Sequence, residues 1–507
     1  MRLAGYTRPS LSVTLGLLVF AAVWLAHLSS TSLSPPTDNI EQLNWVHSLE
    51  WGYYKHPPLP TWLLWGPVQL FGLSAWTSYA TGTALNLAVM GVLWRLMSRL
   101  RGIRFATLAL LAVLCVTYYS AGLYAYNHNT LLTFWSTACA ALCWQAYNSA
   151  RLRWWALLGL ALGLGMVTKY QIVVTMTSVF VFWLTQRGWR DARQRTGLLL
   201  AALLALLVFV PHLQWLRTHN FGPVGYAIES SLGAQLTAAE RVSDVLNWLA
   251  DQLLNRAAAA WLMLAAVLYL SKGAAPLERG AGSPSRSGHG DAAGALILSW
   301  GLVPLLFMPL VGAITGATLQ LRWGAPFLLF TVPAVMELFG RRVQWSRVRL
   351  SSAVQVFAAI QALLLLASYL TSAFGPVSLR DQHWRSFDSK ALASELGPRL
   401  NAALAGHALC VVSGPTALAG ALALQLPDHP LVLIDGRYDR SPWLSTELAR
   451  RCGVLELQLG GVLAGGSLAG PRFPGLWWRV VPPAASSSVP AVSVSGRVAP
   501  APSQGHA

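Results

Sequence analysis

Long apolar runs alternate with short polar or basic segments along most of the chain, and this pattern predicts membrane-spanning helices. Each run is close to the roughly 20 residues that a helix needs to cross the hydrocarbon core of a bilayer. We predict eleven crossings, at residues 11–29, 76–94, 105–122, 129–148, 154–168, 171–186, 196–215, 256–271, 292–314, 323–340 and 351–373. The expected fold is therefore an all-α polytopic membrane protein.

The stretch 154–186 has two interpretations, one long helix or two short helices interrupted at residues 169–171 (KYQ). The basic clusters decide between them, because Lys and Arg concentrate in cytoplasmic loops. With two helices and a cytoplasmic N-terminus, the clusters at 95–104, 151–153, 187–195, 272–286 and 341–349 all fall on the cytoplasmic side. A single helix would place the cluster at 187–195 outside, so we predict a break with Lys169 facing outward.

Composition supports the membrane assignment. Hydrophobic residues make up 54% of the 507 positions and charged residues only 11%, against about 25% charged in soluble domains. The net charge of +17 comes from basic clusters between apolar runs, which speaks against a nucleic-acid partner and in favour of a lipid bilayer. Of five cysteines, Cys410 and Cys452 lie outside the spans and could pair in an oxidising compartment, but their separation is open at this stage.

Three segments outside the predicted spans are long enough to carry chemistry. We expect residues 1–373 to form the transmembrane domain, with outer loops at 30–75 and 217–255, and residues 374–481 to form a small periplasmic α/β domain. Its predicted elements are a strand at 408–412, a helix at 416–426 and a strand at 430–434. Residues 272–291 are expected to be a flexible linker and residues 482–507 a disordered tail.

The first outer loop concentrates acidic, basic and aromatic residues. Apolar positions at Ile40, Leu43, Val46 and Leu49 predict an amphipathic helix over 39–50 that lies on the bilayer, with Asp38 at its N-cap. Capping and catalysis are both open roles for Asp38. The second loop, at 217–255, either covers the active site or is an interfacial helix with a solvated polar face.

Four motifs in order resemble a known family. Asp38 just after the first span is followed by residues 52–59 (GYYKHPPL) and Trp62; residues 129–135 (NTLLTFW), 163–170 (GLGMVTKY) and 323–326 (WGAP) come later. Together they resemble glycosyltransferase family 39, the polyprenyl-phosphate-sugar-dependent membrane enzymes of GT-C architecture that include protein O-mannosyltransferases and lipid A aminoarabinose transferases. The resemblance covers about residues 1–340, and residues 435–444 (DGRYDRSPWL) are similar to the tail of bacterial members.

The resemblance implies an inverting transfer of a sugar from a polyprenyl-phosphate donor to a hydroxyl of a lipid A, envelope glycan or protein acceptor, on the periplasmic face of a bacterial inner membrane. Asp38 would be the general base. The cations expected to hold the donor phosphate are Lys55, His56, Lys169 and Arg322. The expected substrate contacts are Glu41, Tyr53, Tyr54, Tyr170 and Trp323. Snorkelling to the interface is the alternative explanation for Lys169 and Arg322, and the interfacial aromatic belt is the alternative for Tyr53 and Tyr54. His56 could instead only order the turn made by residues 57–58 (PP).

The chain departs from the family at two places. Asn39 follows Asp38 where many members have Glu, and residues 127–129 (NHN) stand where many have an Asp. No cofactor is required by these residues; a divalent cation is compatible with them, but a tight site needs a third ligand besides Asp38 and Glu41, so no metal ligand is assigned.

Two other functions compete with this hypothesis. One is a secondary transporter or flippase for a lipid-linked sugar, although the predicted spans carry little mid-membrane charge. The other is a scaffold that binds lipid-linked intermediates without chemistry.

Overall fold

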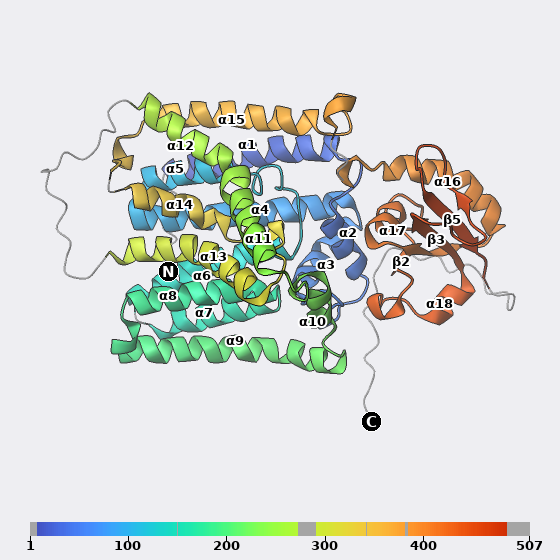
Figure 1. Ribbon diagram of the computed structural model, residues 1–507, viewed down its shortest axis with the longest axis horizontal. Helices are drawn as coiled ribbons and strands as arrows, with labels where there is room; N and C mark the ends of the chain where they lie inside the picture. The colour runs from blue at the N-terminus through green and yellow to red at the C-terminus, as the bar shows by residue number, and fades with distance from the viewer. Residues whose placement is uncertain (1–7, 150, 272–290, 341, 381–383, 484–507) are drawn as a thin grey trace, which may run out of the picture.

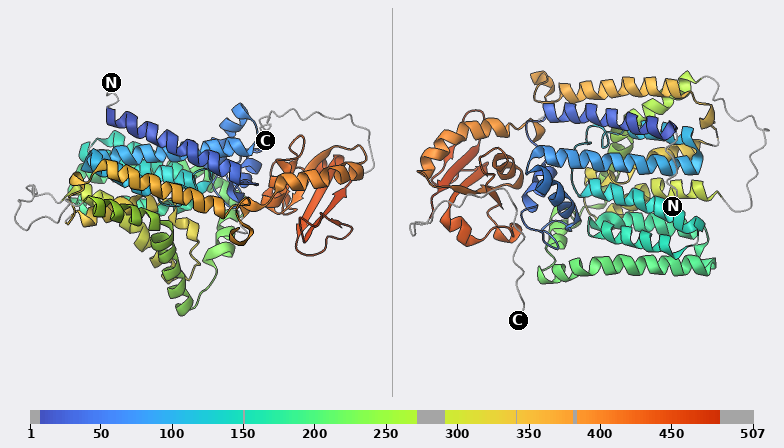
Figure 2. Two further views of the ribbon diagram at one scale, coloured as in Figure 1. Left: turned by 90° about the horizontal axis from the view of Figure 1, so that it is seen from above. Right: turned by 180° about the vertical axis from the view of Figure 1, so that it is seen from behind.

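The computed structural model describes residues 8–149, 151–271, 291–340, 342–380 and 384–483. A bundle of roughly parallel helices fills most of the molecule, and a small sheet with its own helices lies at one end of it (Figure 1). Short helices from the loops lie between the two parts (Figures 1 and 2). The predicted linker at 272–291 and tail at 482–507 lie almost wholly outside the described residues.

A helix lies at each predicted span. These helices are α1 (Arg8–Thr31), α4 (Ala75–Arg101), α5 (Ile103–Val113), α6 (His128–Ser149), α7 (Leu152–Met166), α8 (Val173–Thr185), α9 (Ala192–Thr218), α12 (Ala258–Leu270), α13 (Ala292–Thr315), α14 (Leu328–Phe339) and α15 (Leu350–Leu370). Among the described residues, five helices are long and apolar enough to cross a membrane, or six if a pair bent by 48° counts as one span. The protein is thus a multi-pass membrane protein, while the number eleven stays a prediction.

Two features of the bundle bear on the site. The chain breaks between α7 and α8, where Lys169 is extended before a short 3-10 turn, η1 (Tyr170–Ile172). Helix α5 ends at Val113, well short of the predicted end at residue 122, so that part of the prediction is wrong. Residues 114–127 instead form turns, with bonds such as that from Gly122 N to Thr117 O (3.0 Å), and this non-helical segment is free to line a cavity.

Glycines let α7 pack closely on α9. A Cβ at Gly159 would lie 2.5 Å from the carbonyl oxygen of Ala201, and one at Gly163 would lie 2.6 Å from Cβ of Val208. Real Cβ atoms do not approach other heavy atoms this closely, so glycine at these positions permits this crossing. The Gly-rich run before Lys169 therefore has a packing role.

The first outer loop forms two helices, α2 (Thr37–Trp45) and α3 (Leu59–Phe71). The predicted surface helix over 39–50 is wrong in its bounds and its environment: α2 ends at Trp45 and its residues 39–45 are all buried. Asp38 lies in the first turn, and the N-cap is Pro36. Asp38 therefore does not cap the helix, because its carboxylate has other partners. The helix α3 was not predicted.

The second outer loop contains α10 (Gly222–Ala227), a π-helical turn η3 (Ile228–Leu232), α11 (Ala238–Ala250) and a second π-helical turn η4 (Asp251–Arg256). Thr237 and Glu240 form a reciprocal capping box that starts α11. Figure 2 shows α11 projecting away from the rest of the bundle. The Trp248 side chain of α11 is buried, and its Nε1 donates to Gln320 O (3.3 Å). This bond ties the loop to the segment before α14.

The C-terminal part contains a five-stranded sheet in the order β2-β1-β3-β5-β4. Its elements are α16 (Ser389–Leu404), β1 (Leu409–Gly414), α17 (Thr416–Ala423), β2 (Leu431–Ile434), α18 (Thr446–Arg451), β3 (Gly453–Leu459), β4 (Ser467–Leu468) and β5 (Leu476–Val481). Strand β1 is parallel to β2 and β3, while β5 is antiparallel to β3 and β4. The predicted β-α-β succession from 408 to 434 is confirmed.

The sheet is packed on both sides. On one face, Leu392, Leu418 and Leu422 from the helices form a core with Leu455 and, from the first outer loop, Trp45. On the other, Val411, Leu433, Leu444 and Val454 form a second buried cluster. A disulfide joins Cys410, which packs against this cluster, to Cys452, with Cα atoms 5.6 Å apart. The pairing that the sequence left open is therefore made. The periplasmic placing of this part and the limits 374–481 stay predictions.

Candidate active site

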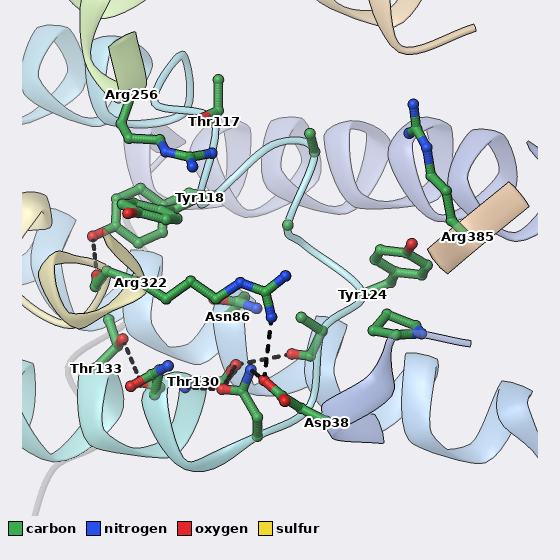
Figure 3. A pocket seen from close by; sticks show the side chains of 18 residues that line it. Asp38, Asn86, Thr117, Tyr118, Tyr124, Thr130, Thr133, Arg256, Arg322 and Arg385 are labelled. Atoms are coloured by element: carbon green, nitrogen blue, oxygen red, sulfur yellow. Dashed lines mark hydrogen bonds and ion pairs between the residues drawn. The ribbon is translucent and has the colours of Figure 1, made fainter. Parts of the chain in front are cut away.

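A cavity of about 470 Å³ lies where the first outer loop meets the turns at 114–127. It is lined by Pro36, Asp38, Asn86, Thr117, Tyr118, Tyr119, Ala121, Gly122, Tyr124, Ala125, Asn127, Asn129, Thr130, Thr133, Arg256, Arg322, Ala325 and Arg385. Figure 3 shows Asp38 and Arg322 pointing toward each other, with Arg256 and Arg385 on opposite sides. Three arginines and one acid thus face the cavity among its described lining residues.

Asp38 is held at the wall of this cavity by two contacts. Its Oδ2 accepts a hydrogen bond from Asn127 Nδ2 (2.9 Å) and lies 3.6 Å from Arg322 Nη1. Asn127 is itself fixed, because its Oδ1 accepts from Thr130 N (2.9 Å) at the start of α6. One of the positions at which the chain departs from the family therefore orients the candidate base.

Arg322 lies on a 3-10 turn, η5 (Leu321–Gly324), that is bonded to the cavity turns. The hydroxyl of Tyr118 donates to Leu321 O and that of Tyr119 to Ala325 O, both at 2.7 Å. Gln171 Nε2 donates to Trp323 O (2.9 Å), which ties the break after α7 to the same turn. These bonds fix the backbone on either side of Arg322, while its side chain stays 57% exposed and open to a ligand.

Arg256 and Arg385 were not predicted. Arg256 ends η4, pairs with Asp251 Oδ2 (3.1 Å) and lies 5.0 Å from the ring centroid of Tyr118. Arg385 lies on a short turn, η8 (Trp384–Ser386), and donates to Thr371 Oγ1 (2.6 Å). The sequence did contain an indication for Arg256, which is a cation directly before an apolar run on the predicted outer side. No sequence pattern indicates that Arg385 lines the site.

Lys169 lies behind the cavity. Its Nζ donates to Asn129 Oδ1 (2.6 Å), and Asn129 is one of the lining residues. Burial lowers the pKa of Lys169 to about 8, against the opposing effect of the Asp38 carboxylate. Its charge therefore changes close to neutral pH.

The other predicted residues of the first loop form a separate cluster beside the cavity. Lys55 Nζ lies 2.7 Å from Glu41 Oε1, and the Tyr54 hydroxyl donates to the same oxygen (3.4 Å). Burial opposes the charged form of Lys55, but the Glu41 carboxylate outweighs it and raises the pKa of Lys55. The Tyr53 ring stacks on Trp45 at 4.5 Å.

His56 is also in this cluster, with its ring 4.1 Å from that of His128. Burial, together with His128 and the ammonium groups of Lys169 and Lys55, holds the pKa of His56 well below its usual range. His56 is therefore a neutral ring near pH 7.

Tyr170 is not one of the residues that line the cavity. Its hydroxyl is 2.8 Å from His212 Nε2, and His212 Nδ1 is 2.6 Å from Trp51 O. The structure thus brings Asp38 and Arg322 together, and Asn129 separates Lys169 from the cavity that they line. The neighbouring cluster contains Glu41, Tyr53, Tyr54, Lys55 and His56. In the part of the chain that the structure describes, no three His, Cys, Asp or Glu side chains gather as they would around a metal ion.

The arrangement suits a reaction that releases an anion. Guanidinium groups stabilise phosphate or carboxylate by charge-assisted hydrogen bonds, and a carboxylate in the same cavity can take a proton from a hydroxyl within hydrogen-bond reach. The cavity therefore combines a candidate base with candidate anion ligands.

Comparison with known proteins gives the same chemical class. Residues 55–215 match the family model described as dolichyl-phosphate-mannose-protein mannosyltransferase. The chain is 24% identical over 412 residues to the lipopolysaccharide core galacturonosyltransferase RgtA of Rhizobium johnstonii, an alignment that covers 78% of this chain and 77% of that one. It is 29% identical over 217 residues to an undecaprenyl phosphate-alpha-4-amino-4-deoxy-L-arabinose arabinosyl transferase of Pseudomonas paraeruginosa, covering 38% of each.

The fold is similar to that of a solved structure. ArnT from Cupriavidus metallidurans bound to undecaprenyl phosphate superposes with a TM-score of 0.60 at 15% identity, covering 92% of this chain and 97% of that one. At this identity the similarity concerns the fold alone, and it extends through the bundle and the C-terminal sheet.

Proposed function

We propose that this chain, a membrane glycosyltransferase of the GT-C class with lipid A aminoarabinose transferase-like relatives, transfers a sugar from polyprenyl phosphate to a hydroxyl of lipopolysaccharide. The relatives supply the donor and acceptor classes, since their names specify an undecaprenyl-phosphate sugar and a lipopolysaccharide core. The positive-inside pattern supports a periplasmic location for the cavity and the C-terminal sheet and a cytoplasmic N-terminus in this proposal.

The observation that carries this proposal is the pairing of Asp38 with Arg322 in a cavity that also contains Arg256. In the proposed reaction the acceptor oxygen bonds to the anomeric carbon while the bond from that carbon to the phosphate oxygen breaks. The electron pair leaves with the phosphate, and Asp38 takes the acceptor proton. A single displacement inverts the anomeric centre.

We assign the phosphate to Arg322 and Arg256, which face the cavity directly. The leaving phosphate gains negative charge as the bond breaks, and donors already in place at that point stabilise the transition state more than the ground state. Lys169 supports the same region through Asn129. Lys55 and His56, which the family pattern favoured as phosphate ligands, lie in the neighbouring cluster and in this proposal shape the loop around α2.

The test is transfer by purified protein from short-chain polyprenyl-phosphate sugars to a panel of lipopolysaccharide acceptors, with release of free polyprenyl phosphate as the readout. We expect Asp38→Asn to lower the rate by about 10²- to 10⁴-fold, the usual contribution of a general base. Glu50→Gln is the matched control, because Glu50 is an acid of the same loop whose carboxylate accepts from Ser48 Oγ (2.5 Å). Wild-type rates in a folded Asp38→Asn preparation would sink the mechanism.

A transporter is not favoured, because the named relatives are transferases. The same preparation tests it: labelled lipid-linked sugar that crosses liposomes without consumption of donor would replace the enzymatic proposal.

A further inference from the structure

The helix α2, which carries Asp38, is fixed to the membrane bundle on one side. Asn39 donates from Nδ2 to Ser78 Oγ (3.0 Å) and Tyr124 O (3.1 Å), and its Oδ1 accepts from Tyr126 N (2.9 Å). These bonds attach α2 to α4 and to the turns that line the cavity. They leave the opposite face of the helix to other contacts.

That opposite face packs directly on α17 of the C-terminal part. A Cβ at Gly420 would lie 2.3 Å from Ile40 Cγ2 and 2.8 Å from Asn44 Nδ2. Contacts below 3.0 Å do not occur for real Cβ atoms, so a side chain at this position requires Ile40, or the helix that carries it, to move. The absence of a side chain at Gly420 sets the distance between α17 and α2.

The segment that leads into α2 is bonded to the segment that leads into α16. The bonds run from Leu33 N to Arg385 O (2.8 Å), from Ser34 Oγ to Phe387 O (2.7 Å) and from Trp384 Nε1 to Pro35 O (2.9 Å). Because Arg385 also lines the cavity, the C-terminal part reaches the site at this point.

A third contact comes from the loop after β2. The Arg440 guanidinium lies 4.9 Å from the ring centroid of Tyr54 and pairs with Asp435 Oδ2 (2.7 Å). Tyr54 in turn bonds Glu41, which lies on α2. The motif at 435–444 therefore contacts the cluster that surrounds the helix.

We propose that the C-terminal sheet region holds α2, and thereby the Asp38 carboxylate, in register with Arg322, and that Gly420 and Arg440 are positioning residues for the transfer. The inference rests on the proposed function, because Asp38 is the base only in that function. A helix of nine residues is too short to be stable alone, so its position depends on what packs against it. The bundle fixes one face of α2 and the C-terminal region fixes the other.

The test compares Gly420→Ala with Gly91→Ala in the full-length protein. Both glycines lie inside helices and gain similar helix propensity, but a Cβ at Gly91 meets nothing within 4 Å. We expect Gly420→Ala to lose on the order of 10²-fold in kcat, the cost of about 1 Å of misplacement, with unchanged stoichiometry of polyprenyl-phosphate binding. Gly91→Ala keeps the wild-type kcat.

A second substitution that removes the clash between residue 420 and Ile40 distinguishes a positioning role from general destabilisation of the fold. Adding Ile40→Ala removes Cγ2, so the double variant should regain about tenfold of the lost kcat if the two sites are coupled through this contact. Arg440→Ala should lose about two- to fivefold, the worth of an exposed cation–π contact. Arg437→Ala, whose guanidinium pairs with Asp439 on the same loop, should lose nothing.

Binding of polyprenyl phosphate gives a readout that needs no transfer. Asp38→Asn should tighten it, since the carboxylate competes for Arg322, and Gly420→Ala should shift affinity in the same direction because it displaces Asp38. A Gly420→Ala protein with wild-type kcat and affinity, or a kcat loss matched by lost binding stoichiometry, would overturn the inference. If wild type binds but transfers nothing, the proposed function fails, and the affinity comparison alone decides this inference.

Discussion

Asp38 and Glu41 lie one turn apart on α2 and each faces a cation, yet the two pairs differ in distance and exposure. Asp38 and Arg322 are 3.6 Å apart, with side chains 36% and 57% exposed; Glu41 and Lys55 are 2.7 Å apart, with side chains 7% and 22% exposed. An exposed pair contributes about 0–1 kcal/mol, so a substrate can displace it at little cost. A buried pair is costly to break. One turn of helix thus separates an exposed ion pair from a buried one.

We expect the largest effect on transfer from a change in the exposed pair, Asp38 and Arg322. Arg322→Ala should lower kcat by about 10²- to 10³-fold, the usual loss when one preorganised donor to a developing anion is removed. Thermal stability should change little, because the Arg322 side chain is exposed. Steady-state transfer and thermal unfolding of the same samples measure both. A rate within threefold of wild type would remove Arg322 from the phosphate site.

A change in the buried pair, Glu41 and Lys55, should instead lower the stability of the protein. Lys55→Ala leaves the buried Glu41 carboxylate unpaired, and we expect it to cost about 3 kcal/mol in free energy of unfolding. Adding Glu41→Gln should restore part of this stability, since it removes the unpaired charge. Denaturant unfolding of the three variants tests this. If Lys55→Ala is as stable as wild type but fails to bind polyprenyl phosphate, Lys55 belongs with the phosphate ligands instead.

The smallest expected effect is the dependence of kcat on pH, which reports the charge of Lys169. Because burial places the pKa of Lys169 at about 8, its ammonium loses its proton as the pH rises through that value. If this charge supports the phosphate, kcat should fall about tenfold per pH unit above the pKa. Lys169→Arg stays charged and should keep its rate to higher pH. An unchanged alkaline limb in Lys169→Arg would assign the decline to another group.

The pair formed by Glu41 and Lys55 should show no such limb. The pKa of Lys55 is higher in the folded than in the unfolded state. The contribution of Lys55 to stability is therefore fully present below the unfolded-state pKa, and it is lost only as the pH rises through the folded-state pKa. Between pH 6 and 9 the contribution of Lys55 should therefore be constant, while burial raises the pKa of Glu41 above its ordinary value.

The sequence predicted the elements whose cause is local. Long apolar runs sufficed for the helices of the bundle, and shorter apolar runs sufficed for β1, α17 and β2. The break at Lys169 followed from charge placement. The motif after the first span led to Asp38 and Glu41, which the structure places on one helix.

What the sequence could not give depends on contacts between distant segments. Arg256 and Arg385 face the same cavity as Asp38 although they lie more than 200 residues beyond it, and no local pattern reports that. The interpretation of Asp38 as an N-cap failed for the same reason: Asn127 and Arg322 bind its carboxylate. The helix predicted on the bilayer surface is instead buried between the bundle and α17, and the lack of a side chain at Gly420 allows the contact with α17.

The contact between α2 and α17 also has a consequence for biosynthesis. The two helices are separated by 370 residues of chain, and translation at about 5–20 residues per second needs roughly 20 to 75 s to cover that distance. During this interval the N-terminal helices are already made while α2 has only its bundle-side contacts. If the C-terminal region positions Asp38 as proposed, a nascent chain carries Asp38 long before α17 can hold α2 in place, and transfer becomes possible only near the end of synthesis.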